Sequence, residues 1–217
     1  MFSAVRSAAP SRLETLKGTH TPAWVRHYPK KVGPKPSDEH WKKFSHDIAR
    51  DFSDVCCYCE VYCKTTVDHF APKSESPELV YEWLNLVNCC GPCNQAKGTF
   101  SFDLNISHPS VPGDRYSPEN IYEYDLLTGH IMVKKSLPPA QFRLATKFLS
   151  KLKINAPHHL KTRMDRLKLL RLELTAANES TNNRAIESQA FLESLTLSSA
   201  PLNSLTAALL TAEAKWR

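Results

Sequence analysis

The chain has 217 residues, of which 41% are hydrophobic, and it carries a formal net charge of +6. The length suits one domain with additions or two small domains, and the apolar fraction is sufficient for a hydrophobic core. No apolar run approaches the ~18 residues of a membrane-spanning helix, and residues 1–12 lack the apolar region of a secretory signal. We therefore expect a soluble, cytoplasmic protein. The acid-free start, with Arg6 and Arg12, also fits an organelle transit peptide.

The charge is unevenly distributed along the chain. Residues 1–50 have a net charge of +6 and residues 140–175 a net charge of +7, whereas residues 51–139 have a net charge of −6. Basic surfaces raise the local concentration of polyanions and steer nucleic acid towards a site. Two basic regions around an acidic centre fit a metal-binding core with phosphate-binding flanks, although two solvated helical faces would give the same pattern.

The first fifty residues predict an arm followed by one helix. Prolines interrupt residues 1–36, and we expect this arm to be irregular. Ser37 is the predicted N-cap of a helix whose first turn contains acidic residues, as the helix dipole favours. The helix ends near Phe52, and its apolar residues recur at helical spacing: Trp41, Phe44, Ile48 and Phe52.

The seven cysteines form two clusters about thirty residues apart, which predicts a metal site in a reducing compartment rather than a disulfide scaffold. Each cluster contains a Cys-x2-Cys pair, and two such pairs supply the four thiolates of a structural zinc site. We expect the ligands Cys56, Cys59, Cys90 and Cys93. Cys57 and Cys89 leave alternative registers open, and Cys63 is spare. A closed zinc site of this kind stabilises the fold and leaves no coordination position for catalysis.

Residues between and after the cysteine pairs carry groups suited to catalysis. Thr65–Phe70 predicts a strand that delivers Asp68 and His69, and a helix is expected just after Cys93. A strand–loop–strand–helix unit can gather five residues around one point: Asp68, His69, Asn85, Asn94 and Lys97. Asp68 and Asn94 offer oxygen ligands for Mg²⁺, and His69 offers a base that is neutral near pH 7.

The rest of the chain predicts a hairpin and several helices. Residues 121–133 predict two strands around a turn at Thr128-Gly129. Apolar residues recur at helical spacing from Pro139 onward, and later helices are expected at about 184–195 and from about Pro201 to the end of the chain. His158 and His159 are adjacent, so on a helix their side chains point apart, and we assign them no metal.

Four segments of the sequence resemble the HNH endonuclease family, and within it the retron-associated and Septu-type HNH proteins of bacterial antiphage defence. In the family pattern the histidine is His69 and the middle asparagine is Asn85, while Asn94 stands at the third position in place of histidine. The resemblance covers about 45 residues, in the segments Cys56–Glu60, Asp68–Ser74, Tyr81–Leu86 and Cys90–Gly98.

The resemblance implies a zinc-stapled ββα-metal core within an α+β fold, and a metal-dependent hydrolysis of phosphodiester bonds. In that reaction His69 deprotonates water, Asp68 and Asn94 bind a catalytic Mg²⁺ or Mn²⁺, Asn85 braces the loop, and Lys97 contacts phosphate. DNA is the expected substrate, with tRNA or other RNA as the alternative. A different class of function also accounts for the cysteines: a non-catalytic, zinc-stabilised nucleic-acid-binding or adaptor subunit.

The resemblance also implies a partner and a division of the chain. The expected partner is an ATPase of the SMC/ABC type (PtuA-like), which controls the nuclease, with a retron reverse transcriptase and its RNA–DNA product as further candidates. We divide the chain into an N-terminal arm (1–36), a nuclease core with the preceding helix and following hairpin (37–135), and a helical C-terminal region (136–217). The arm and the apolar stripe from Leu202 to Trp216 are the expected docking surfaces.

Overall fold

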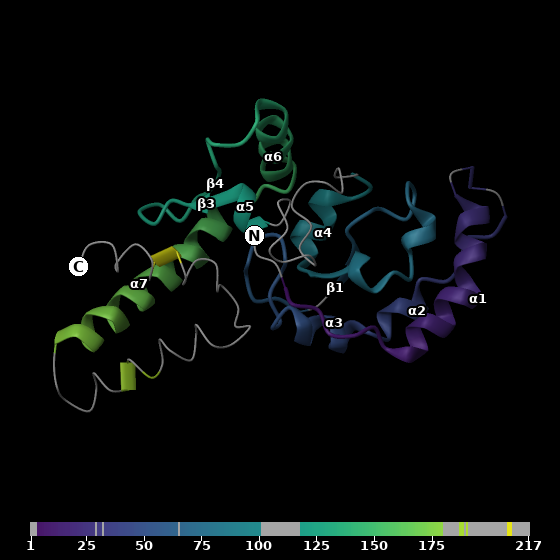
Figure 1. The fold of residues 1–217 in the computed structure, drawn as a ribbon, viewed down its shortest axis with the longest axis horizontal. Coiled ribbons are helices and arrows are strands. Elements are labelled where there is room, and N and C mark those ends of the chain that lie inside the picture. The colour runs from purple at the N-terminus through teal and green to yellow at the C-terminus, as the bar shows by residue number, and fades with distance from the viewer. Residues whose placement is uncertain are drawn as a thin grey trace.

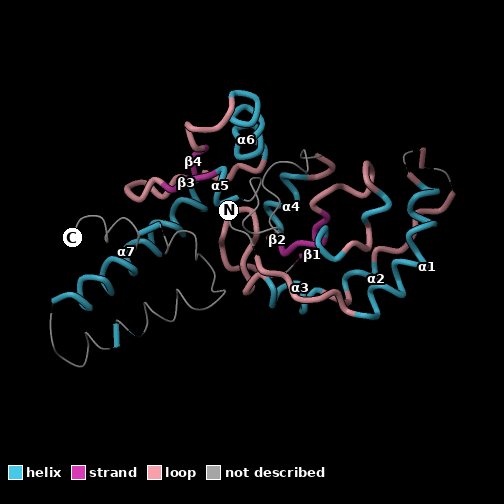
Figure 2. The backbone as a smooth tube through the Cα atoms, viewed as in Figure 1, coloured by secondary structure: helices cyan, strands magenta, loops and turns pink. Residues whose placement is uncertain are grey.

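A computed structural model describes residues 4–28, 30–31, 33–64, 66–100, 118–179, 187–188, 190 and 208–209. Within these residues the fold is α+β, with helices and two small antiparallel sheets (Figures 1 and 2). The helices are α1 (Ser11–His27), α2 (Glu39–Lys42), α3 (Ser45–Asp51), α4 (Gly91–Lys97), α5 (Pro118–Ile121), α6 (Pro139–Lys151) and α7 (Pro157–Glu179). The strands are β1 (Thr66–His69), β2 (Leu86–Cys89), β3 (Tyr122–Tyr124) and β4 (Ile131–Val133).

The N-terminal arm contains a long helix, so the expectation of an irregular segment is wrong for Ser11–His27. Pro22 lies inside α1 and removes one backbone donor, a cost of roughly 3 kcal/mol in a helix interior. Burial of Leu13 and Trp24 against the body of the protein offsets that cost. Tertiary packing therefore overrides the local proline signal.

The residues before α1 are also held in place. Arg6 donates a hydrogen bond from Nε to Asp51 Oδ2 at 3.0 Å, and a second one to the Leu86 carbonyl at 2.6 Å. Its guanidinium lies 4.4 Å from the ring centroid of Trp83. These contacts fasten the start of the described chain to α3 and β2.

The predicted helix ending near Phe52 is divided into α2 and α3. Ser37 Oγ accepts a hydrogen bond from the Glu39 backbone at 3.2 Å, but the N-cap of α2 is Asp38 rather than the predicted Ser37. The helical path is interrupted at Phe44, yet the apolar face is buried as expected: Trp41, Phe44, Ile48 and Phe52.

The strand–loop–strand–helix unit lies at the centre of the fold. Strands β1 and β2 are antiparallel, with Asp68 opposite Val87 and His69 opposite Leu86, and α4 follows β2 directly. The connection from β1 to β2 contains two short 3-10 turns, η1 (Pro77–Leu79) and η2 (Trp83–Asn85). Figure 1 shows α1, α2 and α3 on one side of this unit and α7 at the opposite end of the molecule.

The expected hairpin is confirmed as β3 and β4, with Tyr122 opposite Val133. Gly129 in its turn has a φ of +73°, which favours glycine, and a Cβ there would lie 3.2 Å from the sulfur of Met164 on α7. A side chain at this position would therefore adopt a strained backbone conformation and displace Met164 by a few tenths of an ångström.

The two helices after the hairpin confirm the predicted amphipathic pattern. Ala145 and Phe148 of α6 are buried in the main core, and Leu167 and Leu170 of α7 pack with Leu209 in a second cluster. The rest of the predicted C-terminal stripe and most of the predicted helix at 184–195 lie outside the described residues. Within the described part of the chain, no helix is long and apolar enough to cross a membrane.

Candidate functional site

Four buried cysteines meet between the end of α3 and the start of α4. The sulfur atoms of Cys56, Cys59, Cys90 and Cys93 all lie within 4.8 Å of one another. Cys59 and Cys90 have their sulfurs 3.8 Å apart, close to the spacing of about 3.8 Å that a tetrahedral zinc with ~2.3 Å bonds imposes. The donor set and its packing fit a structural zinc ion, which these four side chains could hold.

The remaining cysteines have separate surroundings. Cys57 donates its backbone N–H to the Asn88 carbonyl at 2.9 Å, so the first cysteine pair is fastened to β2. Burial raises the pKa of the Cys57 and Cys89 thiols well above the ordinary value, which keeps them protonated. Cys63 is half-buried, beside Asn88. The fold therefore brings the sulfurs of the two Cys-x2-Cys pairs together, as the sequence predicts.

Helix α7 supports the cysteine cluster with a buried cation. The Arg163 side chain is fully buried and donates to the carbonyls of Gly129, Ile154 and Cys59 at 2.6, 2.9 and 3.4 Å. Glu60 lies near this cation and accepts a hydrogen bond from the Tyr124 hydroxyl. Arg163 entered the sequence interpretation only as part of a basic region, because nothing in its local spacing shows that it is buried.

His159 also contacts this cluster. Its side chain is 4% exposed and hydrogen-bonds with Cys90, and its Nδ1 lies 3.2 Å from the Lys153 carbonyl. From the sequence, the adjacent histidines are assigned no metal. The structure leaves them out of the four-cysteine group but places one of them against a cysteine of that group.

Asp68 lies at the centre of a buried hydrogen-bond network. Its Oδ2 accepts from the Tyr58 hydroxyl at 2.7 Å and lies 3.2 Å from Lys97 Nζ, which also donates to the His69 carbonyl at 2.7 Å. Burial raises the pKa of Asp68, and the Lys97 charge opposes that rise. Lys97 is only 1% exposed, and these contacts make it a support for β1; its expected contact with phosphate stays a prediction.

His69 is oriented by the loop that follows β1. Its Nε2 lies 2.9 Å from the Val80 carbonyl, and its ring meets Trp41 edge to face at a centroid distance of 4.8 Å. Because a carbonyl only accepts, Nε2 carries the proton and Nδ1 keeps the lone pair. Burial and the nearby Lys73 charge lower the pKa of His69 to about 3, so the imidazole is neutral at physiological pH.

Asn85 connects two parts of the same loop. Its Oδ1 accepts from the Ala71 backbone N–H at 2.7 Å, and its Nδ2 donates to the carbonyls of Ala71 and Leu79 at 3.2 and 3.0 Å. Leu79 directly precedes Val80, the residue that binds His69. Asn85 therefore holds the loop segment that orients the imidazole.

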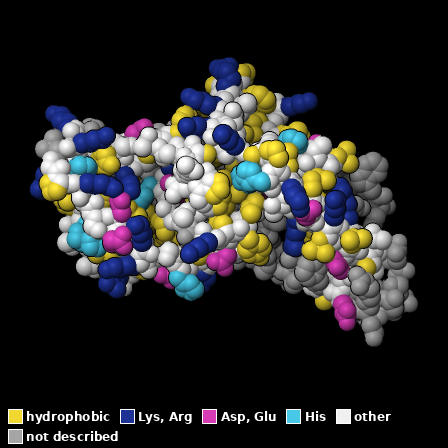
Figure 3. All heavy atoms as spheres, turned by 180° about the vertical axis from the view of Figure 1, so that it is seen from behind, with side chains coloured by type: hydrophobic (Ala, Val, Ile, Leu, Met, Phe, Trp, Pro, Cys, Tyr) yellow, Lys and Arg dark blue, Asp and Glu magenta, His cyan; other side chains and the backbone are white. Residues whose placement is uncertain are grey.

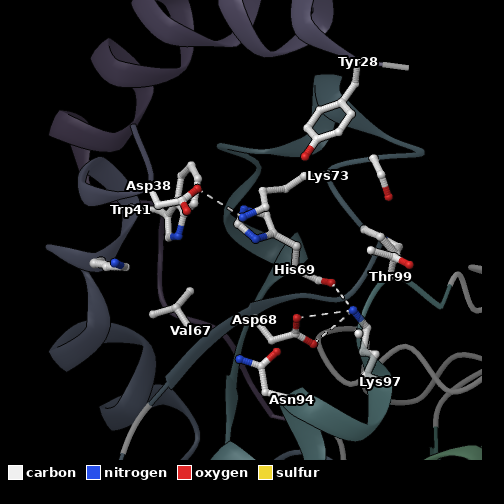
Figure 4. A pocket seen from close by; sticks show the side chains of 14 residues that line it. Tyr28, Asp38, Trp41, Val67, Asp68, His69, Lys73, Asn94, Lys97 and Thr99 are labelled. Carbon is white, nitrogen blue, oxygen red and sulfur yellow. Dashed lines mark hydrogen bonds and ion pairs between the residues drawn. The ribbon is translucent and has the colours of Figure 1, made fainter. Parts of the chain in front are cut away.

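A cavity of about 300 Å³ brings the expected residues together, except Asn85, which is not among its lining residues. Asn94 and Lys97 are three residues apart on α4 and share one face of the helix. Figure 4 shows Asn94 beside Asp68 and the Lys97 amine, whereas the His69 ring lies on the side of Asp38 and Lys73. Both Asp68 and Asn94 offer oxygen atoms, so this donor set fits a hard divalent cation.

The cavity also contains residues that we had not placed in the site: Tyr28, Asp38, Trp41 and Lys73. Lys73 Nζ lies 3.3 Å from Asp38 Oδ1 and 4.6 Å from the Trp41 ring centroid. Lys73 belongs to the Asp68–Ser74 segment that carries the family resemblance, which was the available signal. Asp38 and Trp41 had been interpreted only as helix residues.

Comparison with known proteins finds one partial similarity. The chain is 43% identical over 54 residues to the Septu protein PtuB of Bacillus thuringiensis, a match that covers 22% of this chain. It spans only about a fifth of that protein, 20% of its length. No protein-family profile matches the chain. The similarity supports at most a relationship of the Septu type for part of the chain.

Proposed function

We propose that this protein is a metal-dependent HNH endonuclease that hydrolyses phosphodiester bonds in nucleic acid. The observation that carries the proposal is a neutral, oriented imidazole in the same cavity as two oxygen donors. His69 is held by Val80, and it lines the same cavity as Asp68 and Asn94. A zinc scaffold without catalytic activity has no requirement for this arrangement.

His69 acts as the general base in the proposed reaction. The hydrogen bond to Val80 leaves Nδ1 as the proton acceptor, and that atom takes a proton from the attacking water. Asp68 and Asn94 would hold Mg²⁺ or Mn²⁺, which when bound stabilises charge on the phosphate and on the departing 3′ oxygen. Lys97 favours the ionised form of Asp68 and holds it in position through the buried ion pair, although burial raises the pKa of Asp68.

Lys73 is the proposed phosphate contact at the mouth of the cavity. Its side chain is 26% exposed, whereas Lys97 is buried, so Lys73 is the more accessible of the two amines. Asp38 and Trp41 hold it beside His69 without covering it. A substrate phosphate would take the place of Asp38 as its partner, since both groups are charge-assisted acceptors for the Lys73 amine.

The substrate and biological setting belong to the same proposal. DNA is favoured and tRNA or other RNA is the alternative, because the catalytic residues act on the phosphodiester that both share. The motif resemblance and the partial match to a Septu protein support a role in antiphage defence. They also support control by an ATPase partner of the SMC/ABC type, with the retron reverse transcriptase as a further candidate partner.

The test compares the purified wild type with His69→Ala and with the control His46→Ala, which alters an exposed histidine on α3. Each protein is incubated with plasmid DNA and with total tRNA, in Mg²⁺ or Mn²⁺ and in EDTA, and the products are separated on gels. We expect metal-dependent cleavage that falls at least about 100-fold in His69→Ala, as for the loss of a general base. Zinc content and circular dichroism should match in all three proteins.

Cleavage by His69→Ala at the wild-type rate would remove His69 from the mechanism. If the wild type cuts neither substrate, the assay is repeated with the co-expressed ATPase partner. Continued absence of cleavage in that complex would contradict the nuclease and favour the adaptor function.

A further inference from the structure

Helix α6 exposes a row of positive charge. Arg143, Lys147 and Lys151 are exposed and four residues apart, so they follow one side of the helix at intervals of about 6 Å. Lys153 extends the row just beyond the helix end, and residues 139–153 contain no acidic side chain. The opposite side of α6 is buried through Ala145 and Phe148. Figure 3 shows Lys and Arg side chains around the projecting part of the molecule that contains α6.

Two further hollows join this row to the cavity of the proposed site. The proposed catalytic cavity and the first hollow share Lys97, Gly98 and Thr99, and the first hollow reaches Lys147 and Lys151. The first and second hollows share Gln95, Ala96 and Lys151, and the second extends to Lys153. Shared lining residues therefore connect the three hollows, from the cavity, past the end of α4, to the basic side of α6. Among the residues that the structure describes, Glu75 is the single acidic residue that lines these two hollows.

An aromatic ring lies on this path between two cations. Lys147 Nζ and Lys151 Nζ are 5.0 and 5.8 Å from the ring centroid of Phe100, which is half-buried. Among the residues that the structure describes, neither lysine forms an ion pair with a carboxylate. Unpaired cations beside an aromatic ring suit the phosphates and bases of a nucleic-acid strand.

We infer that Lys147, Lys151 and Lys153 form a phosphate-binding track that holds the substrate backbone beyond the catalytic cavity. The inference rests on the proposed nuclease function and adds the path by which the strand leaves the site. Binding energy comes from the release of condensed counterions as each lysine neutralises a phosphate. The basic residues of α7 that flank its apolar stripe, such as Lys161, are not on this path; Lys161 pairs with Asp165 at 2.7 Å.

The test measures nucleic-acid binding without cleavage, on the full-length, zinc-loaded protein in buffer free of Mg²⁺ and Mn²⁺. The variant is Lys147→Ala/Lys151→Ala/Lys153→Ala, and the matched control is Lys135→Ala/Lys161→Ala/Lys168→Ala, which removes three exposed lysines elsewhere. The probes are a fluorescein-labelled mixed-sequence DNA duplex, one of its strands, and the same strand as RNA. Anisotropy is recorded from roughly 50 to roughly 200 mM salt, a range in which phosphate contacts change the affinity strongly.

We expect the track variant to bind the preferred probe at least about tenfold more weakly. The slope of log affinity against log salt should become shallower by about 2 to 3 for a duplex, since each lost phosphate contact removes about 0.9. The control triple variant should keep the wild-type affinity and slope. Circular dichroism and zinc content must match among the three proteins.

Three results would overturn the inference. The first is an unchanged affinity and slope in the track variant, and the second is a wild type that binds none of the probes. The third is displacement of the probe by poly-glutamate as effectively as by unlabelled DNA of equal charge. That result would indicate a surface that binds acidic proteins rather than nucleic acid. Since His69→Ala retains the track, it should bind like the wild type whether or not the nuclease assignment holds. A negative result in the cleavage test is therefore distinguishable from a negative result in the binding test.

Discussion

The polar groups of the cavity are oriented by backbone atoms of the loop between β1 and β2. His69 is bound by the Val80 carbonyl, and Asn85 fastens the same loop through Ala71 and Leu79. Asn94 lies on α4 and is half-buried. The two asparagines therefore have different tasks, although the family pattern places them in one motif.

Asn85→Ala and Asn94→Ala should separate structural from catalytic effects. Asn85→Ala removes two buried hydrogen bonds and one partly buried one and leaves their backbone partners unsatisfied, so we expect a loss of about 2–4 kcal/mol in the free energy of unfolding. Asn94→Ala should leave stability within about 0.5 kcal/mol of the wild type, as for a substitution outside the packed interior. It should instead raise the Mg²⁺ concentration that half-maximal cleavage requires. Urea unfolding and a Mg²⁺ titration of activity measure the two effects, and an equal loss of stability in both variants would contradict this division.

His69 should also make stability depend on pH. Its pKa is lowered from 6.5 to about 3, so between these values the unfolded chain binds more protons than the folded protein. The free energy of unfolding should therefore fall as the pH decreases through this window, by up to about 1.4 kcal/mol per pH unit. Denaturant unfolding of the wild type and His69→Ala at a series of pH values, without Mg²⁺, measures the difference. Parallel pH profiles for the two proteins would show that His69 does not contribute.

At the level of elements, the buried side chain of Arg163 joins α7 to three other parts of the protein. Arg163 donates to carbonyls in the β3–β4 turn, in the α6–α7 connection and in the first cysteine pair. It also donates to Asn155 Oδ1 at 3.0 Å. The helix thus stabilises the cysteine cluster from outside the segment that carries the family resemblance.

Arg163→Leu should lower the free energy of unfolding by about 2–4 kcal/mol, because several buried carbonyls lose their donor. The control is Arg12→Leu, which changes an exposed arginine near the start of α1. Thermal and urea unfolding compare the two, with zinc content as a second measurement. A stability of Arg163→Leu equal to that of the control would mean that water or another side chain satisfies these carbonyls.

For the whole molecule, the four-cysteine cluster connects elements that are distant in sequence. It joins the segment after α3 to the start of α4 and belongs to the main hydrophobic core, which includes residues of α1, α3 and α6. A bound zinc ion at this position would stabilise most of the described fold, since zinc modules gain an apparent ~10–16 kcal/mol from the metal.

Zinc removal should therefore unfold the protein rather than only inactivate it. We expect Cys93→Ser to lose bound zinc and cooperative unfolding, because it removes one of the four thiolates. Cys63→Ser should keep both, since Cys63 lies outside the cluster. Metal content and thermal unfolding distinguish the variants. A folded, zinc-free Cys93→Ser protein would show that packing alone holds the core.

Several features of the fold and candidate site were predictable from local spacing. The Cys-x2-Cys pairs, the strand that carries Asp68 and His69, the hairpin and the amphipathic α6 and α7 depend on residues only a few positions apart. The division of the helix at Phe44 and the helix in the N-terminal arm were not predictable, because the burial of Trp24 and Trp41 in the tertiary core outweighs local signals.

The sequence by itself determined which cysteines could bind zinc and which acidic, imidazole and amide groups lie within one short segment. Only the tertiary structure decided how those groups are held. Tyr58 and Asp68, His69 and Val80, and Arg163 and Cys59 are 10, 11 and 104 residues apart. Such contacts depend on the path of loops and on which polar groups become buried, and these are set by packing across the whole chain rather than by the periodicity of any one segment.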